Sequence, residues 1–444
     1  MEGPRYLLFL LLLLHHNNLH LHQLAYVQAL IKKRRRHPRF WVKPWLTATR
    51  RLAHGHYHRL MQELRMEDTS SFVNFMRMEP QMFDELVARL SPRISRQDTN
   101  WRKALEPGLK VAIALRYLAS GDRYSTLSYS FRVSRHTIAK FLPLVCRAIV
   151  DEFKEEVISC PTTHDEWKAK AGEFERKWNI PHAVGALDGK HVAIRKPPQS
   201  GSLYHNYKGF FSIILLALVN ADYKFLWADV GSMGHRSDAQ IFNDSELRDC
   251  FEDGTINLPP PEPMTNDVKP FPYFMLADDA FALRTYLTKP YSKRGMTDEE
   301  LITNYRISRG RRVVENAFGI LASRWQALLT TLQQYPKVAV VVVEAAICLH
   351  NLMRMRYPGR RLQNMELDED DASHKMVPGE WRNHAPLHQL QLVRGPNQAT
   401  TEAKRQREYL RLFWEISGNV LGVEMEWLGR YRNGRDLVRS LLER

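Results

Sequence analysis

The stretch that decides the fold is HAVGALDGKHVAI, at residues 182–194, a compact apolar run that contains a single aspartate. Two similar runs follow it closely, FFSIILLALVNA at 210–221 and YKFLWADVG at 223–231. Short apolar runs bounded by Gly, Pro, Asp or Asn are typical of buried strands. We therefore predict three meandering strands here, and a further strand within YFMLADDAF at residues 273–281.

Helical patterns alternate with these strands and follow them. They are DAQIFNDSELRDCF (238–251), RRVVENAFGILASRWQALL (311–329) and VAVVVVEAAICLHNLMRM (338–355). Because strands and helices alternate, the sequence predicts an α/β layer domain with a mixed sheet over residues 156–358. Within it, NLPPPEPMTNDVKPFP (257–272) is predicted to be a loop, since its prolines cannot continue a helix or a central strand.

The region before the sheet, residues 61–155, is predicted to be an all-helical domain, because its apolar residues recur at helical spacing. Its last part, residues 124–149, has the layout of a helix-turn-helix, with Ser134 as the expected N-cap of the second helix. Three apolar residues of that helix should point inward, namely Ile138, Phe141 and Leu142. Three basic residues should point outward, namely Arg135, His136 and Lys140. Outward basic residues at this point suit a DNA groove, but an ordinary helical hairpin with a solvated basic face has nearly equal weight.

Composition narrows the class of protein. The chain has 444 residues, of which 44% are hydrophobic and 25% charged, so it should be globular over most of its length. Its four cysteines are scattered without a CxxC pair, which excludes a disulfide scaffold and the usual zinc frameworks and favours a reducing compartment. The net charge of +15 points to a polyanion such as DNA as the partner.

The positive charge is concentrated in a basic N-terminal arm, residues 1–60, which hold eleven Lys or Arg and one acidic residue. The arm begins with the apolar run YLLFLLLLL at 6–14, which is shorter than the roughly 18 residues of a membrane-spanning helix and lacks a nearby A-x-A cleavage pattern. We therefore expect no membrane association. A basic block follows the run and suits nuclear import or phosphate contact: Lys32, Lys33, Arg34, Arg35 and Arg36. The expected location is the nucleus, with the cytoplasm as a second compartment.

The chain beyond residue 358 changes character. Residues 359–400 are polar, with the acidic run ELDEDD, and are predicted to be a flexible linker. Residues 401–444 are predicted to begin with a helix that docks on the body of the protein, although a partner helix could use the same apolar face. The docking residues are expected to be Tyr409, Leu410, Phe413 and Trp414.

Three carboxylates stand where chemistry could use them. Asp188 and Asp278 each end an apolar strand, and Glu315 lies on a helix that should pack on the same sheet. Phosphodiester hydrolysis commonly uses two divalent cations about 3.5 to 4 Å apart, and such hard cations take oxygen ligands. Each carboxylate alone is more often a surface or capping residue, but Asp, Asp and Glu in strand, strand, helix order is the layout of an RNase H-like nuclease. Arg311 and Arg312, one turn before Glu315, would meet phosphates.

The runs VGALDGKHVAI, YHNYKGFFSIILLALVNADYKFLWADVGSMGHRSDAQIF, FMLADDAFAL, RRVVENAFGILASRW and CLHNLM resemble the catalytic domain of PIF/Harbinger transposases and the nuclease derived from them. The resemblance extends from about residue 38 over most of the chain. It implies an RNase H-like fold, a DDE triad carried over as Asp188, Asp278 and Glu315, and Mg²⁺ or Mn²⁺ as cofactor. It also implies nicking of DNA, strand transfer and a Myb-like DNA-binding partner.

The sequence departs from the family pattern before the second aspartate, where Ala277 replaces the usual glycine. The doublet Asp278 and Asp279 leaves open which of the two binds metal. Asp238 aligns with an aspartate that recurs in the family; it could help to arrange the site, but we predict it to be a helix N-cap.

Two functions follow. The first is a metal-dependent DNA endonuclease or transposase, with a homodimer as the natural form for pairing two DNA ends. The second is a domesticated DNA-binding or partner-recruiting protein that retains the nuclease core as a scaffold. Intact carboxylates favour the first, and the choice between a transposase and a derived nuclease stays open.

Overall fold

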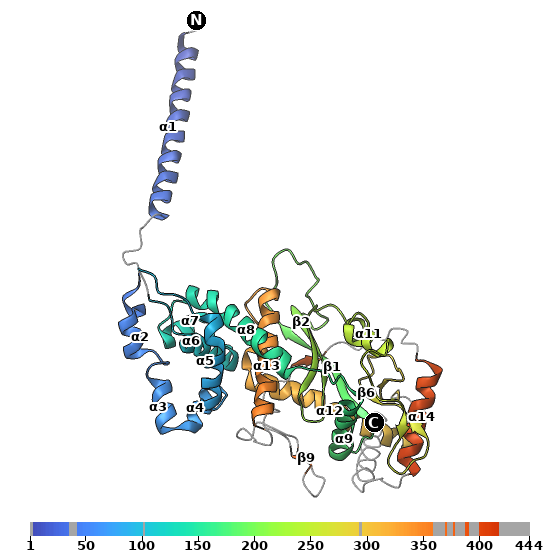
Figure 1. The fold of residues 1–444 in the computed structure, drawn as a ribbon. Helices are drawn as coiled ribbons and strands as arrows, with labels where there is room; N and C mark the ends of the chain where they lie inside the picture. Colours follow the sequence, from blue (N-terminus) through green and yellow to red (C-terminus); the bar gives the residue numbers. More distant parts are fainter. Residues whose placement is uncertain are drawn as a thin grey trace, which may run out of the picture.

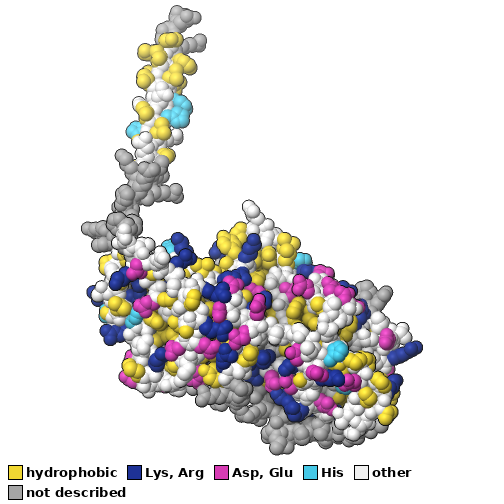
Figure 2. All heavy atoms as spheres, in the orientation of Figure 1, with side chains coloured by type: hydrophobic (Ala, Val, Ile, Leu, Met, Phe, Trp, Pro, Cys, Tyr) yellow, Lys and Arg dark blue, Asp and Glu magenta, His cyan; other side chains and the backbone are white. Residues whose placement is uncertain are grey.

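The computed structural model describes residues 3–34, 42–100, 103–292, 295–357, 369–370, 376–377, 387–389 and 399–416. Helix α1 (Gly3–Arg34) stands away from the remainder of the chain (Figure 1). The leucines of its first half are exposed around the helix (Figure 2). The other described elements form one body, made of a helical part and a part built on a sheet (Figure 1).

Helices fill the first part, as the apolar spacing predicts. They are η1 (Pro44–Leu46), α2 (Ala48–His54), α3 (Leu60–Glu67), α4 (Thr69–Met76), α5 (Pro80–Ile94), α6 (Pro107–Ser120), α7 (Tyr124–Phe131) and α8 (Arg135–Val157). Helix α6 is buried along almost its whole length, because α4, α5, α7 and α8 surround it.

The turn between α7 and α8 is short. Arg132 ends α7 in the left-handed conformation, with φ of 54°. Ser134 occupies the N-cap position of α8 as predicted, but its side chain makes no capping hydrogen bond. The helical hairpin is therefore present, while its use in reading DNA stays a prediction.

The second part is built on a mixed sheet, as the sequence predicts. Strands β1 (Ala183–Ala193), β2 (Ser212–Val219) and β3 (Phe225–Met233) form an antiparallel meander. On the other side of β1, β6 (Phe274–Leu276) and β7 (Leu287–Thr288) run parallel to it, which gives the order β3-β2-β1-β6-β7.

Helices cover both faces of this sheet. One face packs on α12 (Asp298–Arg324) and α13 (Pro336–Arg356), in an apolar core that continues into the helical part. The other face packs on α10 (Asp238–Asn243), α11 (Glu246–Glu252) and the start of α9 (His164–Trp178). Strand β1 thus runs through the middle of the protein, and its residues are buried along almost its whole length.

Helix α13 is the one helix among the described residues that is long and apolar enough to span a membrane. However, 72% of that stretch is buried, as befits a core helix. Helix α14 (Thr401–Ile416) docks on the body as predicted, with Leu410 0% and Trp414 2% exposed.

Several predicted boundaries are wrong. The segment predicted as one helix at 238–251 is two, because the Ser245 side chain accepts from Arg248 N and starts α11. Helix α12 begins at Asp298, capped by Thr297 and Glu300, well before the predicted start. The predicted loop at 257–272 contains two short strands, β4 (Glu262–Pro263) and β5 (Pro270–Phe271), which pair antiparallel over two residues each. Proline is compatible with a strand at positions where its backbone does not have to donate a hydrogen bond.

Most of the predicted linker 359–400 lies outside the described residues. Its described pieces include β8 (Glu369–Asp370), β9 (Met376–Val377) and β10 (His388–Gln389). Strand β10 pairs antiparallel with β1 at Lys190 and His191, so at these residues the linker adds to the main sheet.

Candidate metal centre

Asp188 lies in the middle of β1, between strands that pair on both sides. Its side chain is on the sheet face covered by α12, because side chains alternate along a strand and its neighbours Ala186 and Val192 belong to that core. Only 3% of the residue is exposed. A carboxylate so deeply buried must be paired or bound to a cation.

Asp278 is brought to Asp188 by the parallel pairing of β6 with β1. Leu276, the last residue of β6, pairs with Ala186, so both chains continue into their aspartates side by side. One carboxylate oxygen of Asp278 accepts a hydrogen bond from Ala280 N at 2.9 Å. The neighbouring Asp279 is exposed, and its Oδ1 lies 4.0 Å from Lys289 Nζ. The geometry therefore brings Asp278, and not Asp279, into the centre.

Asp238 is the third carboxylate, and its predicted role as a helix N-cap is wrong. Ser237 is the cap of α10, in a capping box with Gln240, and Asp238 is the first helical residue. Its side chain is therefore available for the centre, where it is 2% exposed. Its Oδ1 is buried and makes no hydrogen bond within the described part of the chain.

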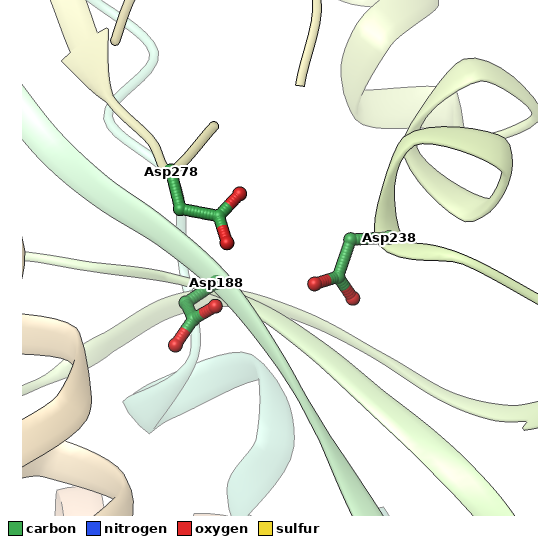
Figure 3. A group of neighbouring side chains, drawn as sticks. All are labelled: Asp188, Asp238 and Asp278. Atoms are coloured by element: carbon green, nitrogen blue, oxygen red, sulfur yellow. The ribbon is translucent and has the colours of Figure 1, made fainter. Parts of the chain in front are cut away.

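Gly189 allows Asp238 to approach from the opposite face of the sheet. A Cβ at Gly189 would lie 1.9 Å from Asp238 Oδ1, a distance that no two such atoms tolerate. Carboxylate oxygens of Asp188, Asp238 and Asp278 consequently lie within 4.8 Å of one another (Figure 3). Figure 3 shows the three side chains converging from β1, the start of α10 and the end of β6.

The pKa values of Asp238 and Asp278 are both raised in this centre. Burial, and then the charge of Asp188, raises the pKa of Asp278 to about 6. Burial raises the pKa of Asp238 well above its usual value, and the charges of Asp188 and Asp278 add to that effect. A bound divalent cation would reverse this balance by stabilising the ionised forms.

Two side-chain cations enter the same centre. Lys190, two residues after Asp188 on the same face of β1, places Nζ 2.8 Å from Asp188 Oδ2. Arg311 Nη1 lies 2.8 Å from Glu315 Oε1 and 4.0 Å from Asp188 Oδ2. Glu315 is thus connected to the aspartates through Arg311 and stands outside the group of three whose oxygens converge.

The other predicted site residues lie elsewhere. Arg312 is on α12 beside Arg311, half-buried. Arg135, His136 and Lys140 are all exposed at the start of α8 and do not belong to the group of converging carboxylates. The backbone of Lys32, Lys33 and Arg34 ends α1, whereas their side chains and all of Arg35 and Arg36 lie outside the described residues.

The donor set fits a hard divalent cation such as Mg²⁺ or Mn²⁺. It offers carboxylate oxygens alone, which such ions prefer, and one of those oxygens is buried without a hydrogen-bond partner among the described residues. The sequence did not point to Lys190, and it offered Asp238 as a residue that could help to arrange the site while favouring an N-cap role for it. The glycine that follows Asp188 and the Ser237 capping box were the signals that could have found Asp238.

The comparisons with known proteins agree with this picture. Residues 187–351 match the model of the DDE superfamily endonucleases, and residues 53–151 match a domain of unknown function. The chain is 26% identical over 310 residues to Putative nuclease HARBI1 of Xenopus laevis, covering 68% of this chain and 83% of that protein. The human protein of the same name is 26% identical over 306 residues, with the same coverage.

A plant protein is also similar. Protein ALP1-like of Arabidopsis thaliana is 24% identical over 270 residues, covering 59% of this chain and 64% of that protein. No solved structure matches the chain. The aspartates described above, Asp188, Asp238 and Asp278, all fall inside the matched endonuclease segment. Residues 187–351 are therefore similar to the DDE superfamily endonucleases, and this match agrees with the resemblance of the sequence to Harbinger transposases and the nucleases derived from them.

Proposed function

We propose that this protein is a divalent-metal-dependent DNA endonuclease of the Harbinger type, with an RNase H-like catalytic domain. The observation that carries the proposal is the convergence of Asp188, Asp238 and Asp278 within 4.8 Å, with two of the three almost fully buried. Buried carboxylates repel one another and are costly to the fold unless a cation joins them. Because the three aspartates lie inside the segment that matches the endonucleases, a cation bound there would serve the cleavage of phosphodiester bonds.

Each charged residue of the centre would have a separate role in the proposed reaction. A Mg²⁺ or Mn²⁺ ion held by the three aspartates would supply the Lewis acidity that phosphodiester hydrolysis needs. Arg311 holds Glu315 beside the centre, and Lys190 forms an ion pair with Asp188. Arg312, on the next position of α12, would meet the phosphate of the substrate.

DNA is the proposed substrate, and the start of α8 is its proposed contact in the helical part. Arg135, His136 and Lys140 are exposed there and follow a short turn after α7. On the face seen in Figure 2, Lys and Arg side chains are mixed with acidic ones over the body, so this surface alone does not explain the net charge. The basic arm is therefore the proposed second contact.

Further features of the proposal come from the family. They are strand transfer at a target DNA, a Myb-like partner, a homodimer that pairs two DNA ends, and a nuclear location with some protein in the cytoplasm. The rival function is a domesticated DNA-binding protein whose nuclease core is only a scaffold. The intact set of buried carboxylates favours the enzyme, because a scaffold gains nothing from ionisable groups that repel one another.

Nicking of supercoiled plasmid in Mn²⁺ separates the two functions. The wild-type chain should nick the plasmid, and Asp278→Asn should reduce nicking to the level of buffer alone. Asp279→Asn is the matched control, since it removes the adjacent exposed carboxylate and should leave nicking unchanged. Equal nicking by wild type and Asp278→Asn, or none by either, would remove the enzymatic proposal in favour of the scaffold.

A further inference from the structure

The centre contains two side-chain cations of its own, Lys190 and Arg311. Lys190 is 4% exposed, with Nζ 2.8 Å from Asp188 Oδ2 and 5.8 Å from the centre of the Phe318 ring. Lysine is almost never buried this deeply unless it is paired. Its ammonium therefore neutralises Asp188 from the side of α12.

Arg311 occupies the space between Asp188 and Glu315. Its Nη1 is 2.8 Å from Glu315 Oε1 and 4.0 Å from Asp188 Oδ2. In a two-metal centre the ions lie about 3.5 to 4 Å apart and act on opposite sides of the reacting phosphate. If the aspartates hold one ion, a second one shared by Asp188 and Glu315 would need the position that this guanidinium takes.

The charges of the centre favour one divalent ion. The centre has four carboxylates, since Asp188, Asp238 and Asp278 converge and Glu315 is joined to them through Arg311. The positive charges of Lys190 and Arg311 offset two of the four negative charges. The adjacent Asp279 has its own cation, Lys289, whose Nζ is 4.0 Å away, so this pair does not alter the balance. A single divalent cation neutralises the charge that is left.

We propose that Lys190 and Arg311 take the place of a second divalent cation, so that this chain binds one divalent ion where a two-metal centre would bind two. The ion lies among Asp188, Asp238 and Asp278, and the side-chain cations stand on the side of Glu315. This inference rests on the metal centre of the proposed function and adds its stoichiometry.

The stoichiometry of Mn²⁺ binding to the full chain tests the inference without measuring cleavage. Isothermal titration calorimetry should give one ion per chain, and electron paramagnetic resonance should show an isolated Mn²⁺ without spin coupling to a neighbour. Two ions per chain, or a coupled pair, would overturn the inference and leave the proposed nuclease intact. No binding at all would overturn both, because the centre itself would then hold no metal.

Substitutions identify the residues responsible. Lys190→Met should raise the affinity for the first ion about tenfold or more, because a like charge beside it is removed. Lys190→Met combined with Arg311→Met should admit a second ion, detected as a spin-coupled pair, and adding Glu315→Gln should return the count to one. Lys154→Met, on the surface of α8, is the matched control and should retain one ion with unchanged affinity.

Circular dichroism and thermal melting establish that each variant is folded before its metal content is interpreted. If the double variant is folded and still binds one ion, the side-chain cations do not exclude the second, and the inference is wrong. If the double variant does not fold, the stoichiometry and spin state of the wild-type chain still decide between one ion and two.

Discussion

Gly189 and Asp238 illustrate how much one residue controls in this centre. The aspartate crosses from the α10 side of the sheet to the others at the place where β1 has no side chain. A methyl group at that position would overlap Asp238 Oδ1, 1.9 Å away. The position of the third carboxylate thus depends on a glycine whose backbone conformation is ordinary, because only a residue without a side chain leaves room for Asp238.

Gly189→Ala should therefore weaken Mn²⁺ binding about tenfold or more, because Asp238 must move away from the other two aspartates. Titration calorimetry of the variant against the wild type measures the change. Gly172→Ala on α9 is the matched control, since nothing lies within 4 Å of a Cβ built there. It should leave Mn²⁺ affinity unchanged and raise the free energy of unfolding by about 0.5 to 1 kcal/mol. Unaltered metal affinity in Gly189→Ala would mean that Asp238 is not a ligand.

Asp278 gives the metal-free protein a dependence of stability on pH. Because the pKa of Asp278 is raised to about 6, the folded chain retains a proton that the unfolded chain releases near pH 4. The associated stability is fully present below about pH 4 and is lost as the pH rises through about 6.

Asp278→Asn cannot ionise and should escape this loss. In EDTA at pH 7 its free energy of unfolding should exceed that of the wild type by about 1 to 2 kcal/mol, a value that allows for the partial exposure of Asp278. At pH 4 the difference should be close to zero. Urea denaturation at both pH values measures it, with Asp279→Asn as the control. The same small difference at both pH values would contradict the raised pKa.

The sequence predicted Asp188 and Asp278 correctly as neighbours, because each follows an apolar run that could only be a buried strand. It named Asp238 as a residue that could help to arrange the site but favoured an N-cap role, because α10 reaches the centre across the sheet and periodicity does not record that crossing. It could not predict Lys190. A lysine in an apolar strand is visible in the sequence, but its ion pair depends on which face of β1 meets α12.

At the scale of elements, Asn351 connects three segments that are far apart in the chain. Its Nδ2 donates to Val157 O and Phe225 O, and its Oδ1 accepts from Phe225 N, so α13 is tied to the end of α8 and to β3. The adjacent His350 is also completely buried, and its Nε2 lies 2.8 Å from Tyr223 O. Burial lowers the pKa of His350 well below its usual value, so the neutral ring donates to that carbonyl.

Asn351→Ala should destabilise the fold by about 3 kcal/mol, because it leaves buried backbone groups of Phe225 and Val157 without their hydrogen bonds. The exposed Asn243, at the end of α10, provides the control, and Asn243→Ala should change stability by less than about 0.5 kcal/mol. Chemical denaturation measures both. A loss as small as that of the control would show that water replaces the three hydrogen bonds.

Helices and strands were predicted well where their residues are continuously buried, and poorly where a capping residue determines the end of a helix. The apolar runs located β1, β2, β3 and α13 within a few residues. The start of α12 was missed because its first turns are polar, and Thr297 with Glu300 sets that start through a capping box. The interruption between α10 and α11 depends in the same way on the hydroxyl of Ser245.

Helix α8 allows a test of DNA binding that stays within a single element. Arg135→Ala with Lys140→Ala should weaken binding to duplex DNA and reduce the slope of log affinity against log salt by about 2, if both side chains contact phosphates. Lys154→Ala, near the other end of the same helix, removes an exposed charge and should change neither quantity. Fluorescence anisotropy over a salt series measures the slopes. Equal slopes for all three proteins would mean that DNA does not contact the start of α8.

On the scale of the whole molecule, the helical part and the sheet share one apolar core. The core runs without a break from Met61 through α8 and α13 to Trp414. Ion pairs support the same junction, since Arg356 Nη2 on α13 lies 2.8 Å from Glu85 Oε1 and 2.9 Å from Glu156 Oε1. The boundary that the sequence predicts near residue 155 is therefore not a separation between independently packed cores.

The body should consequently unfold in one cooperative transition. Calorimetry should give a single peak, and tryptophan fluorescence and far-ultraviolet circular dichroism should report the same midpoint. A fragment ending at residue 155 should not fold, because it exposes the face of α8 that α13 covers. Two separated transitions in the intact chain would show that the shared core does not couple the parts.

The four carboxylates come from β1, α10, the end of β6 and α12, so they are contributed over the interval from Asp188 to Glu315. During synthesis on the ribosome, a nascent polypeptide that has passed Asp188 still lacks the other carboxylates of the proposed nuclease centre. Premature termination anywhere in that interval gives a product with an incomplete set. The proposed nuclease centre can therefore assemble only after translation has passed Glu315.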